Sequence, residues 1–488
     1  MHPHRRRRTL AVASPEEILN RLETLRSNDA PTHGGRVLSY VYDSGLPELD
    51  ALAASAMELV QPVNGLDPTT FTSVAAMERE VIEFARNLLH GDQNTVGTIT
   101  SGGTESCLLA VKRARTNYQG AGAPKILAPS TVHAAFHKAA EYFELELDLV
   151  PVQANGQLQA ARLIERMDEN TALVVISAPA YPYATLDPIT EIAAVASVRG
   201  IECHVDACIG GWILPFWPNL PEWDLRVRGV TSIAADLHKY GYAPKGISVL
   251  LTQGRDTQRS QYFATTNWPG YPVVNSTLLG SKSAAPLAAA WAIINYLGET
   301  GFQALAESTH NSTQTLLTHI SSIKGLRVLG SPTGPLFAVA QDDSLTPETR
   351  IDPHLWADRL GTLGWRAQLQ PAYRQPDGTT LPRTTHLTIT PVTAASVTEL
   401  CSAMTVAAQD VRGVPGINPQ EVLASLDLEV LPELNSQSAQ ELLTGLGLAD
   451  NSAGLPAAMA QVMALIEALP ASFSQRLLVE LMARLIEP

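Results

Sequence analysis

The stretch SIAADLHKYGYAPKG, residues 232–246, decides the interpretation of the whole chain. Its first residues are apolar and predict a buried strand, and the chain then turns at Gly241 and Gly246 before a second apolar run. Lys239 therefore lies at the end of a predicted strand, where burial favours the neutral, nucleophilic form of its amine. Such an amine can form a Schiff base with the aldehyde of pyridoxal phosphate (PLP).

An aspartate and a glycine-rich turn further upstream suit the same cofactor. Asp206 ends the apolar run IECHVD, about one strand–helix–strand unit before Lys239. A buried aspartate there can pair with the pyridine nitrogen of PLP. The segment VGTIT, residues 96–100, runs into SGGTES, residues 101–106, which predicts a strand, a glycine turn and the start of a helix. The free backbone N–H groups of a helix start suit a phosphate.

Five motifs then follow one another along the chain: SGGTES at 101–106, HAAF at 133–136, SAPAYPY at 177–183, HVDACIGG at 204–211 and ADLHKYGYAPKG at 235–246. In this order they resemble the group II PLP-dependent decarboxylase family, and within it the sphingosine-1-phosphate lyase branch looks closest. The resemblance extends from residue 36 to the region of residue 400.

Seven strand-like runs alternate with helical segments, at 96–100, 125–128, 147–152, 172–177, 201–206, 230–235 and 247–251. This alternation is typical of an α/β protein with a mostly parallel sheet. The resemblance implies fold type I of the PLP-dependent transferases, as in aspartate aminotransferase, with a seven-stranded sheet and a smaller C-terminal α+β domain. We expect an N-terminal arm with helices at 1–70, a large PLP-binding domain at 71–290, a small domain at 291–410 and a helical extension at 411–488.

The resemblance also implies how individual residues would hold the cofactor ring. Lys239 would form the Schiff base, and Asp206 would pair with the pyridine nitrogen. His133 would stack on one face of the ring, and Cys208 would pack against the other.

Other residues would hold the cofactor phosphate. The resemblance assigns Gly103 and Thr104 to it through backbone amides and the threonine hydroxyl. His238 would reach the same phosphate, and Ser281 would reach it from a partner chain. Lys282 stands where the family usually has an arginine, and a lysine keeps the charge but loses the forked geometry.

Two tyrosines match tyrosines of the lyase branch near the reacting bond. Tyr42 ends RVLSYVY, residues 36–42, which resembles the pattern KVSGAVY, and we expect it to approach the cofactor from across a subunit boundary. Tyr183 ends SAPAYPY. Either phenol can act as an acid or a base once a neighbouring charge lowers its pKa.

Two reactions remain open, because PLP can stabilise a carbanion made by breaking different bonds. The first is cleavage of a phosphorylated long-chain amino alcohol to a fatty aldehyde and phosphoethanolamine, which needs a base for the β-hydroxyl and a cation for the distal phosphate. The second is decarboxylation of an amino acid. A PLP-fold scaffold without activity is a third, weaker hypothesis, since Lys239 and Asp206 are both present.

Composition limits the partners and the compartment. A formal net charge of −14 argues against nucleic-acid binding. Four scattered cysteines without a Cys-x-x-Cys pair predict a reducing cytoplasm and no metal site. No apolar run approaches the ~20 residues of a membrane span, so we expect no membrane anchor. The expected assembly is a homodimer with shared active sites.

The two ends of the chain predict helices. Residues 14–28 predict an amphipathic helix after a disordered tail that includes the arginines at 5–8. Short amphipathic helices are predicted after residue 414, with a role in packing or assembly.

Overall fold

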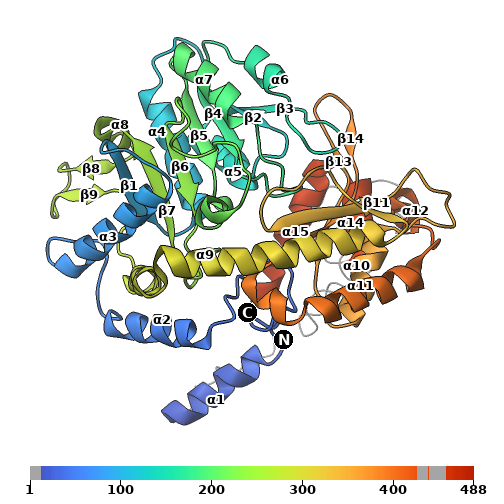
Figure 1. Ribbon diagram of the computed structural model, residues 1–488. Coiled ribbons are helices and arrows are strands. Elements are labelled where there is room, and N and C mark those ends of the chain that lie inside the picture. The colour runs from blue at the N-terminus through green and yellow to red at the C-terminus, as the bar shows by residue number, and fades with distance from the viewer. Residues whose placement is uncertain (1–12, 426–437, 439–457, 488) are drawn as a thin grey trace, which may run out of the picture.

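The computed structural model describes residues 13–425, 438 and 458–487, so the arginine run and part of the predicted C-terminal helices lie outside the described residues. Its centre is a seven-stranded sheet with the order β1-β7-β6-β5-β4-β2-β3 (Figure 1). Strand β7 is antiparallel to both of its neighbours, and the other pairs are parallel. The strands are β1 (Thr95–Thr100), β2 (Lys125–Pro129), β3 (Glu146–Val150), β4 (Thr171–Ser177), β5 (Glu202–Asp206), β6 (Ser232–Ala235) and β7 (Ser248–Gln253).

Helices cover both faces of this sheet, because successive strand residues point to opposite sides. On β4, Leu173 and Val175 pack with one set of helices, and Val174 and Ile176 pack with the other. The first set is α4 (Gly103–Asn117) and α5 (Ala134–Phe143). The second set is α3 (Thr72–Leu88), α7 (Ile189–Arg199) and the first part of α9 (Ala285–Ser322).

The predicted fold class is confirmed, including the mostly parallel seven-stranded sheet. The predicted strand bounds differ from the observed ones by no more than two residues. The short helices α6 (Ala160–Glu165) and α8 (Arg255–Arg259) complete this part of the chain.

Helix α9 links the large sheet to a second, smaller sheet. It is 38 residues long and breaks at Gly298, whose φ of +53° lies in the left-handed region that favours glycine. Figure 1 shows it running from beneath the large sheet to the small sheet, where α10 and α11 lie below it. The small sheet has the order β10-β11-β15-β12 and is antiparallel. Its elements are β10 (Leu326–Val328), β11 (Leu336–Gln341), β12 (Gln368–Gln370), β15 (Thr384–Thr388), α10 (Pro353–Thr362) and α11 (Val397–Val411).

The N-terminal arm attaches to the small sheet through its backbone. Leu38 N–H donates to Arg366 C=O at 2.7 Å, and Thr388 N–H donates to Leu38 C=O at 2.8 Å. Leu38 itself is buried in the small-domain core. The residues that follow it, Tyr40 and Tyr42, are therefore carried to the large domain by a segment that the small domain holds.

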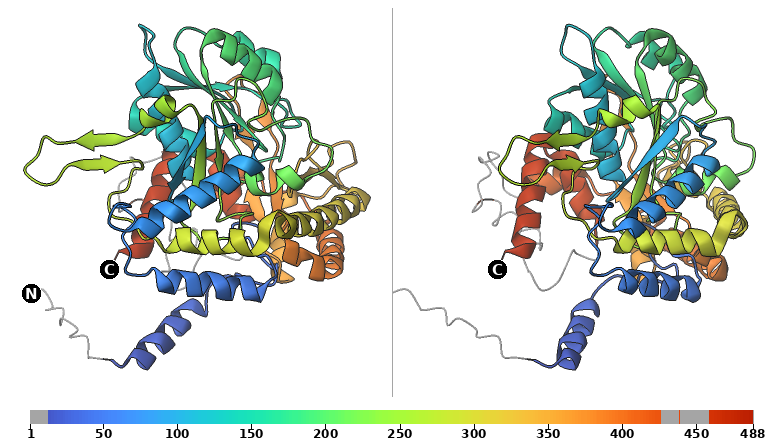
Figure 2. Two further views of the ribbon diagram at one scale, coloured as in Figure 1. Left: turned by 60° about the vertical axis from the view of Figure 1, so that its left-hand side comes forward. Right: turned by 90° about the vertical axis from the view of Figure 1, so that its left-hand side faces the viewer.

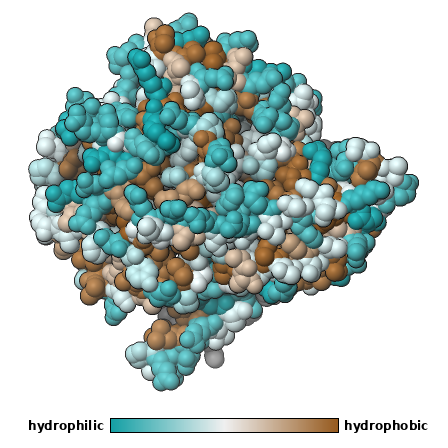
Figure 3. All heavy atoms as spheres, viewed as in Figure 1, coloured by the Kyte–Doolittle hydropathy of each residue, from teal (hydrophilic) through white to brown (hydrophobic). Residues whose placement is uncertain are grey.

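Two elements project from the body of the molecule (Figure 2). One is α1 (Pro15–Arg26), which has no buried residue. The other is a hairpin of β8 (Phe263–Thr265) and β9 (Val273–Asn275). The apolar face predicted for the first helix is exposed, with 65% of Leu25 accessible. Hydrophobic side chains are visible on this helix at the bottom of Figure 3.

The described part of the C-terminal extension packs on the small domain. Arg383 forms ion pairs with Glu467 of α14 and with Asp352, and all three side chains are at least four-fifths buried. The carboxylate of Asp358 accepts from two backbone N–H groups at the start of α14. The remaining elements are α2 (Pro47–Leu59), β13 (Tyr373–Arg374), β14 (Thr380–Leu381), α12 (Pro419–Ser425), α14 (Ala460–Ala468) and α15 (Ala471–Ile486).

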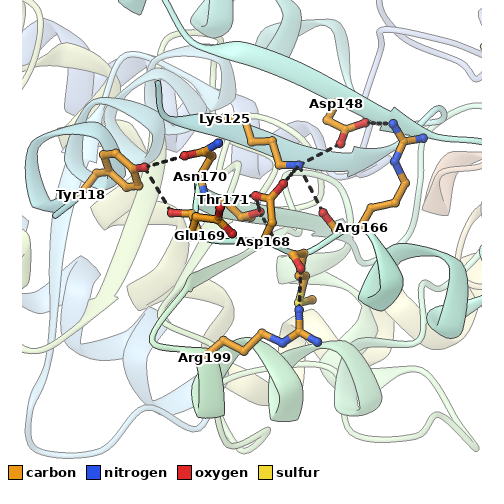
Figure 4. A network of polar contacts seen from close by, with 10 residues as sticks. Tyr118, Lys125, Asp148, Arg166, Asp168, Glu169, Asn170, Thr171 and Arg199 are labelled. Atoms are coloured by element: carbon orange, nitrogen blue, oxygen red, sulfur yellow. Dashed lines mark hydrogen bonds and ion pairs between the residues drawn. The ribbon is translucent and has the colours of Figure 1, made fainter. Parts of the chain in front are cut away.

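A network of ion pairs joins β2, β3 and β4 near their amino ends (Figure 4). Lys125 Nζ lies 3.2 Å from Asp148 Oδ2 and 2.8 Å from Asp168 Oδ2, and Arg166 pairs with the other oxygen of Asp148. Burial alone would lower the pKa of Lys125, but the two carboxylates outweigh it and raise that pKa. The charges at this end of the sheet therefore neutralise one another within the network.

No described helix combines the length and the hydrophobicity that a bilayer span requires.

Candidate active site

A cavity of about 550 Å³ opens where β1, β4, β5 and β6 end. Open α/β sheets place their ligands at the carboxyl ends of strands, so this is the expected position of a binding site. The cavity is lined by Tyr40, Tyr42, Ser101, Gly102, Gly103, Thr104, Glu105, Cys107, His133, Ser177, Pro179, Tyr181, Asp206, Cys208, Ile209, Asp236, His238, Lys239, Lys245 and Gln368.

The turn between β1 and α4 is packed so closely that position 103 has no room for a side chain. A Cβ on Gly103 would lie 2.6 Å from Asp236 Oδ2 and 2.7 Å from Cys208 Sγ. Gly102 has a φ of +147° and no side chain to cap the helix, so the first N–H groups of α4 face the cavity without a capping partner. Thr104 adds an accessible hydroxyl. This cradle fits a phosphate.

Lys239 forms an ion pair that the sequence did not predict. Its Nζ lies 3.0 Å from Asp236 Oδ2, and His238 Nε2 lies 3.4 Å from the same oxygen. Burial alone would lower the pKa of Lys239, but Asp236 outweighs it and raises that pKa well above its usual value. The expectation of a neutral amine is therefore wrong for the protein without cofactor, because a buried carboxylate holds the proton on the lysine.

Asp236 carries one unsatisfied oxygen. Its Oδ1 is buried and has no hydrogen-bond partner among the described residues. Burial would raise its pKa, yet Lys239 and His238 lower it, so the carboxylate stays charged. His238 accepts from the N–H of Ile247 through Nδ1, which fixes its ring beside Gly102 at the phosphate cradle.

Asp206, Cys208 and His133 surround the remaining space. Asp206 ends β5, and its Oδ1 accepts from the N–H of Cys208 at 3.1 Å. His133 is the N-cap of α5 and accepts from Ala135 N–H. The ligand atoms of Cys107, Asp206 and Cys208 lie within 4.8 Å of one another. Because these groups line the same cavity as Lys239 and the phosphate cradle, we interpret them as the surroundings of a cofactor ring.

Tyr42 lies in the cavity of its own chain. Its ring meets Tyr240 edge-on at 5.2 Å, and Lys245 Nζ lies 4.6 Å from the ring centre. The expectation that Tyr42 arrives from a partner is therefore wrong, because the arm bound to the small sheet delivers it within the chain. Burial raises its pKa to about 12, which contradicts the expected lowering.

Tyr183 does not line the cavity. It is buried against Gly156, and burial raises its pKa to about 12. Tyr181, two residues earlier, lines the cavity instead. The motif SAPAYPY thus predicted the right segment, but the tyrosine that lines the cavity is Tyr181, while Tyr183 packs against Gly156 instead.

Ser281 also lies outside this cavity. It lines a neighbouring cavity of about 330 Å³ and accepts from Asn64 Nδ2 at 3.2 Å. Its predicted contact with a partner's cofactor stays a prediction. Lys282 beside it pairs with Glu78 at 3.3 Å.

Among the cavity residues to which the sequence assigned no role, five have side chains that bear on the chemistry: Tyr40, Tyr181, Asp236, Lys245 and Gln368. Asp236 and Lys245 stand inside the decisive motif, so their proximity to Lys239 was readable from the sequence. Gln368 comes from the small domain and carries no local signal.

Comparisons with known proteins agree with this geometry. The pyridoxal-dependent decarboxylase conserved domain matches residues 42–329, more than half of the chain. The chain belongs to this family. The C-terminal putative HTH domain of pyridoxal-dependent enzymes matches residues 418–484. The resemblance predicted from the motifs is confirmed.

The chain is similar to several sphingosine-1-phosphate lyases. The enzyme of Rattus norvegicus is 34% identical over 359 residues, which cover 72% of this chain and 62% of the rat protein. That of Saccharomyces cerevisiae is 32% identical, covering 83% of this chain and 68% of the yeast protein. The chain thus spans less than two thirds of the rat enzyme.

The fold is also similar to that of a solved structure. The sphingosine-1-phosphate lyase of Burkholderia pseudomallei has a TM-score of 0.76 at 30% identity, covering 87% of this chain and 97% of that one. The predicted cofactor, PLP, is confirmed by the family, and the cradle at Gly103, the lysine and the ring-sized space beside Asp206 fit it.

Proposed function

We propose that the chain is a PLP-dependent carbon–carbon lyase that resembles sphingosine-1-phosphate lyase. Its substrate is a phosphorylated long-chain amino alcohol, and its products are a fatty aldehyde and phosphoethanolamine. The names of the rat, yeast and Burkholderia pseudomallei relatives support this substrate class.

The observation that carries the proposal is a second lysine in the cavity. Lys245 Nζ donates to the backbone oxygen of His238 at 3.0 Å, and no carboxylate among the described residues forms an ion pair with it. Lys239, by contrast, is paired with Asp236. A positive charge without a carboxylate partner among the described residues, close to the reacting lysine, suits the distal phosphate of an amino alcohol.

The chain's residues divide into those that hold the cofactor and those that face the substrate. Lys239 would hold the cofactor covalently, Asp206 would face the ring nitrogen, and His133 and Cys208 would contact the two faces of the ring. Gly103, Thr104 and His238 would bind the cofactor phosphate, with Ser281 of the partner subunit as a further contact. The bound cofactor would supply an electron sink for the bond that breaks.

Two phenols border the substrate. Burial raises the pKa of both Tyr42 and Tyr181, so each holds its proton near neutral pH. Tyr42 Oη is therefore a proton donor in this scheme, the acid of the two roles expected for it. Tyr42 lines the same cavity as Lys239, and Lys245 Nζ lies 4.6 Å from its ring centre. The amine of Lys239, once the substrate has displaced it from the cofactor, would take the proton of the β-hydroxyl.

Product analysis tests the proposal. The holoenzyme is incubated with phosphorylated amino alcohols and with amino acids, and aldehyde and CO₂ are assayed together. We expect aldehyde from the amino alcohols and no CO₂. Release of CO₂ from an amino acid, with the amino alcohols untouched, establishes the decarboxylase alternative and rejects the lyase.

A matched variant separates the two reactions further. Lys245→Met keeps the length of the side chain and removes the charge. It should abolish cleavage of the phosphorylated substrate while the visible absorbance of bound cofactor persists. Retained cleavage would remove Lys245 from the substrate site.

The assembly in this proposal is a homodimer in the cytoplasm. The exposed apolar side chains of α1 and of the β8–β9 hairpin, which both project from the body, support a second copy (Figure 2). The four free cysteines support a reducing compartment. Light scattering of the purified chain should give the mass of a dimer, and an active monomer would contradict the assembly.

A further inference from the structure

One wall of the cavity belongs to the small domain. Gln368 of β12 and His386 of β15 are paired residues of the antiparallel ladder. Both contact Tyr181, which follows β4 of the large sheet. A tyrosine of one domain is thus held by two neighbouring side chains of the other.

The two contacts fix the orientation of the Tyr181 side chain. Tyr181 Oη donates to Gln368 Oε1, and the Tyr181 ring stacks on His386 with centroids 4.4 Å apart and an interplanar angle of 29°. His386 is fully buried, which lowers its pKa to about 4 and keeps the ring neutral. His386 therefore provides a flat packing surface for the Tyr181 ring, and Gln368 accepts the hydroxyl proton and so determines its direction.

The direction of that proton limits what Tyr181 can do. A phenol has one proton to donate, and Tyr181 gives it to Gln368. Burial raises the pKa of Tyr181, so the phenol is not ionised near neutral pH. Toward the cavity, its oxygen can only accept a hydrogen bond.

We propose that Gln368 is a positioning residue that makes Tyr181 an acceptor for the substrate's hydroxyl next to the bond that breaks. A substrate that carries this hydroxyl satisfies the phenol oxygen, and an amine without it leaves the oxygen unpaired. The wall formed by Tyr181 and Gln368 thus selects β-hydroxylated amines. This inference rests on the proposed lyase function.

The amide is suited to this task because its two ends differ. Its oxygen accepts from Tyr181, and a side-chain hydrogen bond to Tyr40 lowers the pKa of that phenol against the effect of burial. The side chain of Gln368 thus interacts with both phenols at this wall of the cavity, and its oxygen accepts from Tyr181. Tyr40 lines the cavity with a φ of +60°, so a strained backbone presents it there.

The experiment compares two ligands on the holoenzyme. The first is a phosphorylated 2-amino alcohol with a hydroxyl on the carbon next to the amine carbon, and the second is the same compound without that hydroxyl. Steady-state kinetics give KM and kcat for the first, and calorimetry gives Kd for the second. The variants are Gln368→Met, which removes the acceptor, and Gln368→Glu, which retains one.

Gln370→Met is the matched control, because Gln370 lies on the same strand, accepts from Thr384 and does not line the cavity. We expect Gln368→Met to raise KM about 10-fold, the effect of one lost hydrogen bond, with the Kd of the unhydroxylated ligand changed less than about twofold. Gln368→Glu and Gln370→Met should keep KM within about threefold of the wild type.

Two results would overturn the inference. One is an unchanged KM in Gln368→Met, and the other is an equal loss for both ligands, which indicates a structural role only. If the wild type binds both ligands without cleaving either, the lyase proposal fails. Calorimetry of the two ligands then still measures whether the hydroxyl preference depends on Gln368.

Discussion

Buried lysines at the two ends of the large sheet differ in their ion-pair partners. At the amino end, Lys125 meets Asp148 and Asp168, and Arg166 completes the network (Figure 4). At the carboxyl end, Lys239 has one partner, Asp236, and shares the cavity with Lys245. The charges at the amino end balance within their own network, whereas Lys245 at the carboxyl end has no carboxylate partner among the described residues.

This difference in pairing distinguishes a structural lysine from a functional one, whereas burial does not. Both ends have a buried lysine with a raised pKa. The carboxyl end also has an open cavity, an unpaired oxygen on Asp236 and, lining that cavity, a lysine whose pKa is lowered. Groups that remain incompletely paired in a pocket are the ones available to ligands.

The largest effect is expected at Lys239. Lys239→Ala removes the amine that holds the cofactor, so activity should fall by at least about 10⁴-fold and the visible absorbance of bound PLP should disappear. Absorbance spectra and aldehyde assays measure both. A variant that keeps its spectrum would show that another amine binds the cofactor.

The pair of tyrosines after β4 should differ in the same way as the two lysines. Tyr181→Phe removes an acceptor in the cavity and should lower kcat/KM about 10- to 100-fold. Tyr183→Phe alters a packed residue outside the cavity and should leave kcat/KM within about twofold. Equal losses in the two variants would refute the assignment of Tyr181 over Tyr183.

Lys245 should make substrate capture depend on pH. Burial and the charge of Lys239 lower its pKa to about 8, so the amine is charged below that pH and neutral above it. If the charge binds a phosphate, kcat/KM for a phosphorylated substrate falls about tenfold per pH unit above 8. Lys245→Arg, which stays charged, should remove this descent. A rise of kcat/KM through pH 8 would instead identify Lys245 as a base.

The smallest effect on activity is expected at Lys125. Lys125→Met leaves Asp148 and Asp168 without their shared cation, which should cost about 2 kcal/mol of unfolding free energy. The activity per folded molecule should not change. Urea denaturation measures the unfolding free energy, and kinetics measure the activity. A loss of cofactor from the folded variant would contradict a purely structural role for Lys125.

The sequence predicted the large sheet well because its signals are local. Each signal predicts the structure of the segment in which it stands. This holds for the apolar runs, for the glycine turn at Gly102–Gly103 and for the motif around Lys239. Gly103 and Asp206 were predicted from the residues beside them, and both line the cavity. Residues close to the ends of parallel strands meet at one edge, so order along the chain is enough to group them.

What the sequence did not predict depends on contacts between distant segments. Gln368 and Tyr181 are 187 positions apart in the sequence, and the hydrophobic periodicity of a sequence does not predict such a contact. Tyr42 was expected from a partner because the backbone bonds of Leu38 to the small sheet could not be foreseen. The pKa of Lys239 was misjudged for a different reason. Asp236 stands only three positions away, but burial was inferred from the strand without weighing the charge of this carboxylate, which outweighs it.

The most direct test of the central claim is the identity of the lysine that carries the cofactor. The wild-type holoenzyme is reduced with borohydride, which fixes PLP to its lysine, and the labelled peptide is mapped by mass spectrometry. The account predicts a single label on Lys239. A label on Lys245, or on Lys125 at the other end of the sheet, would contradict it.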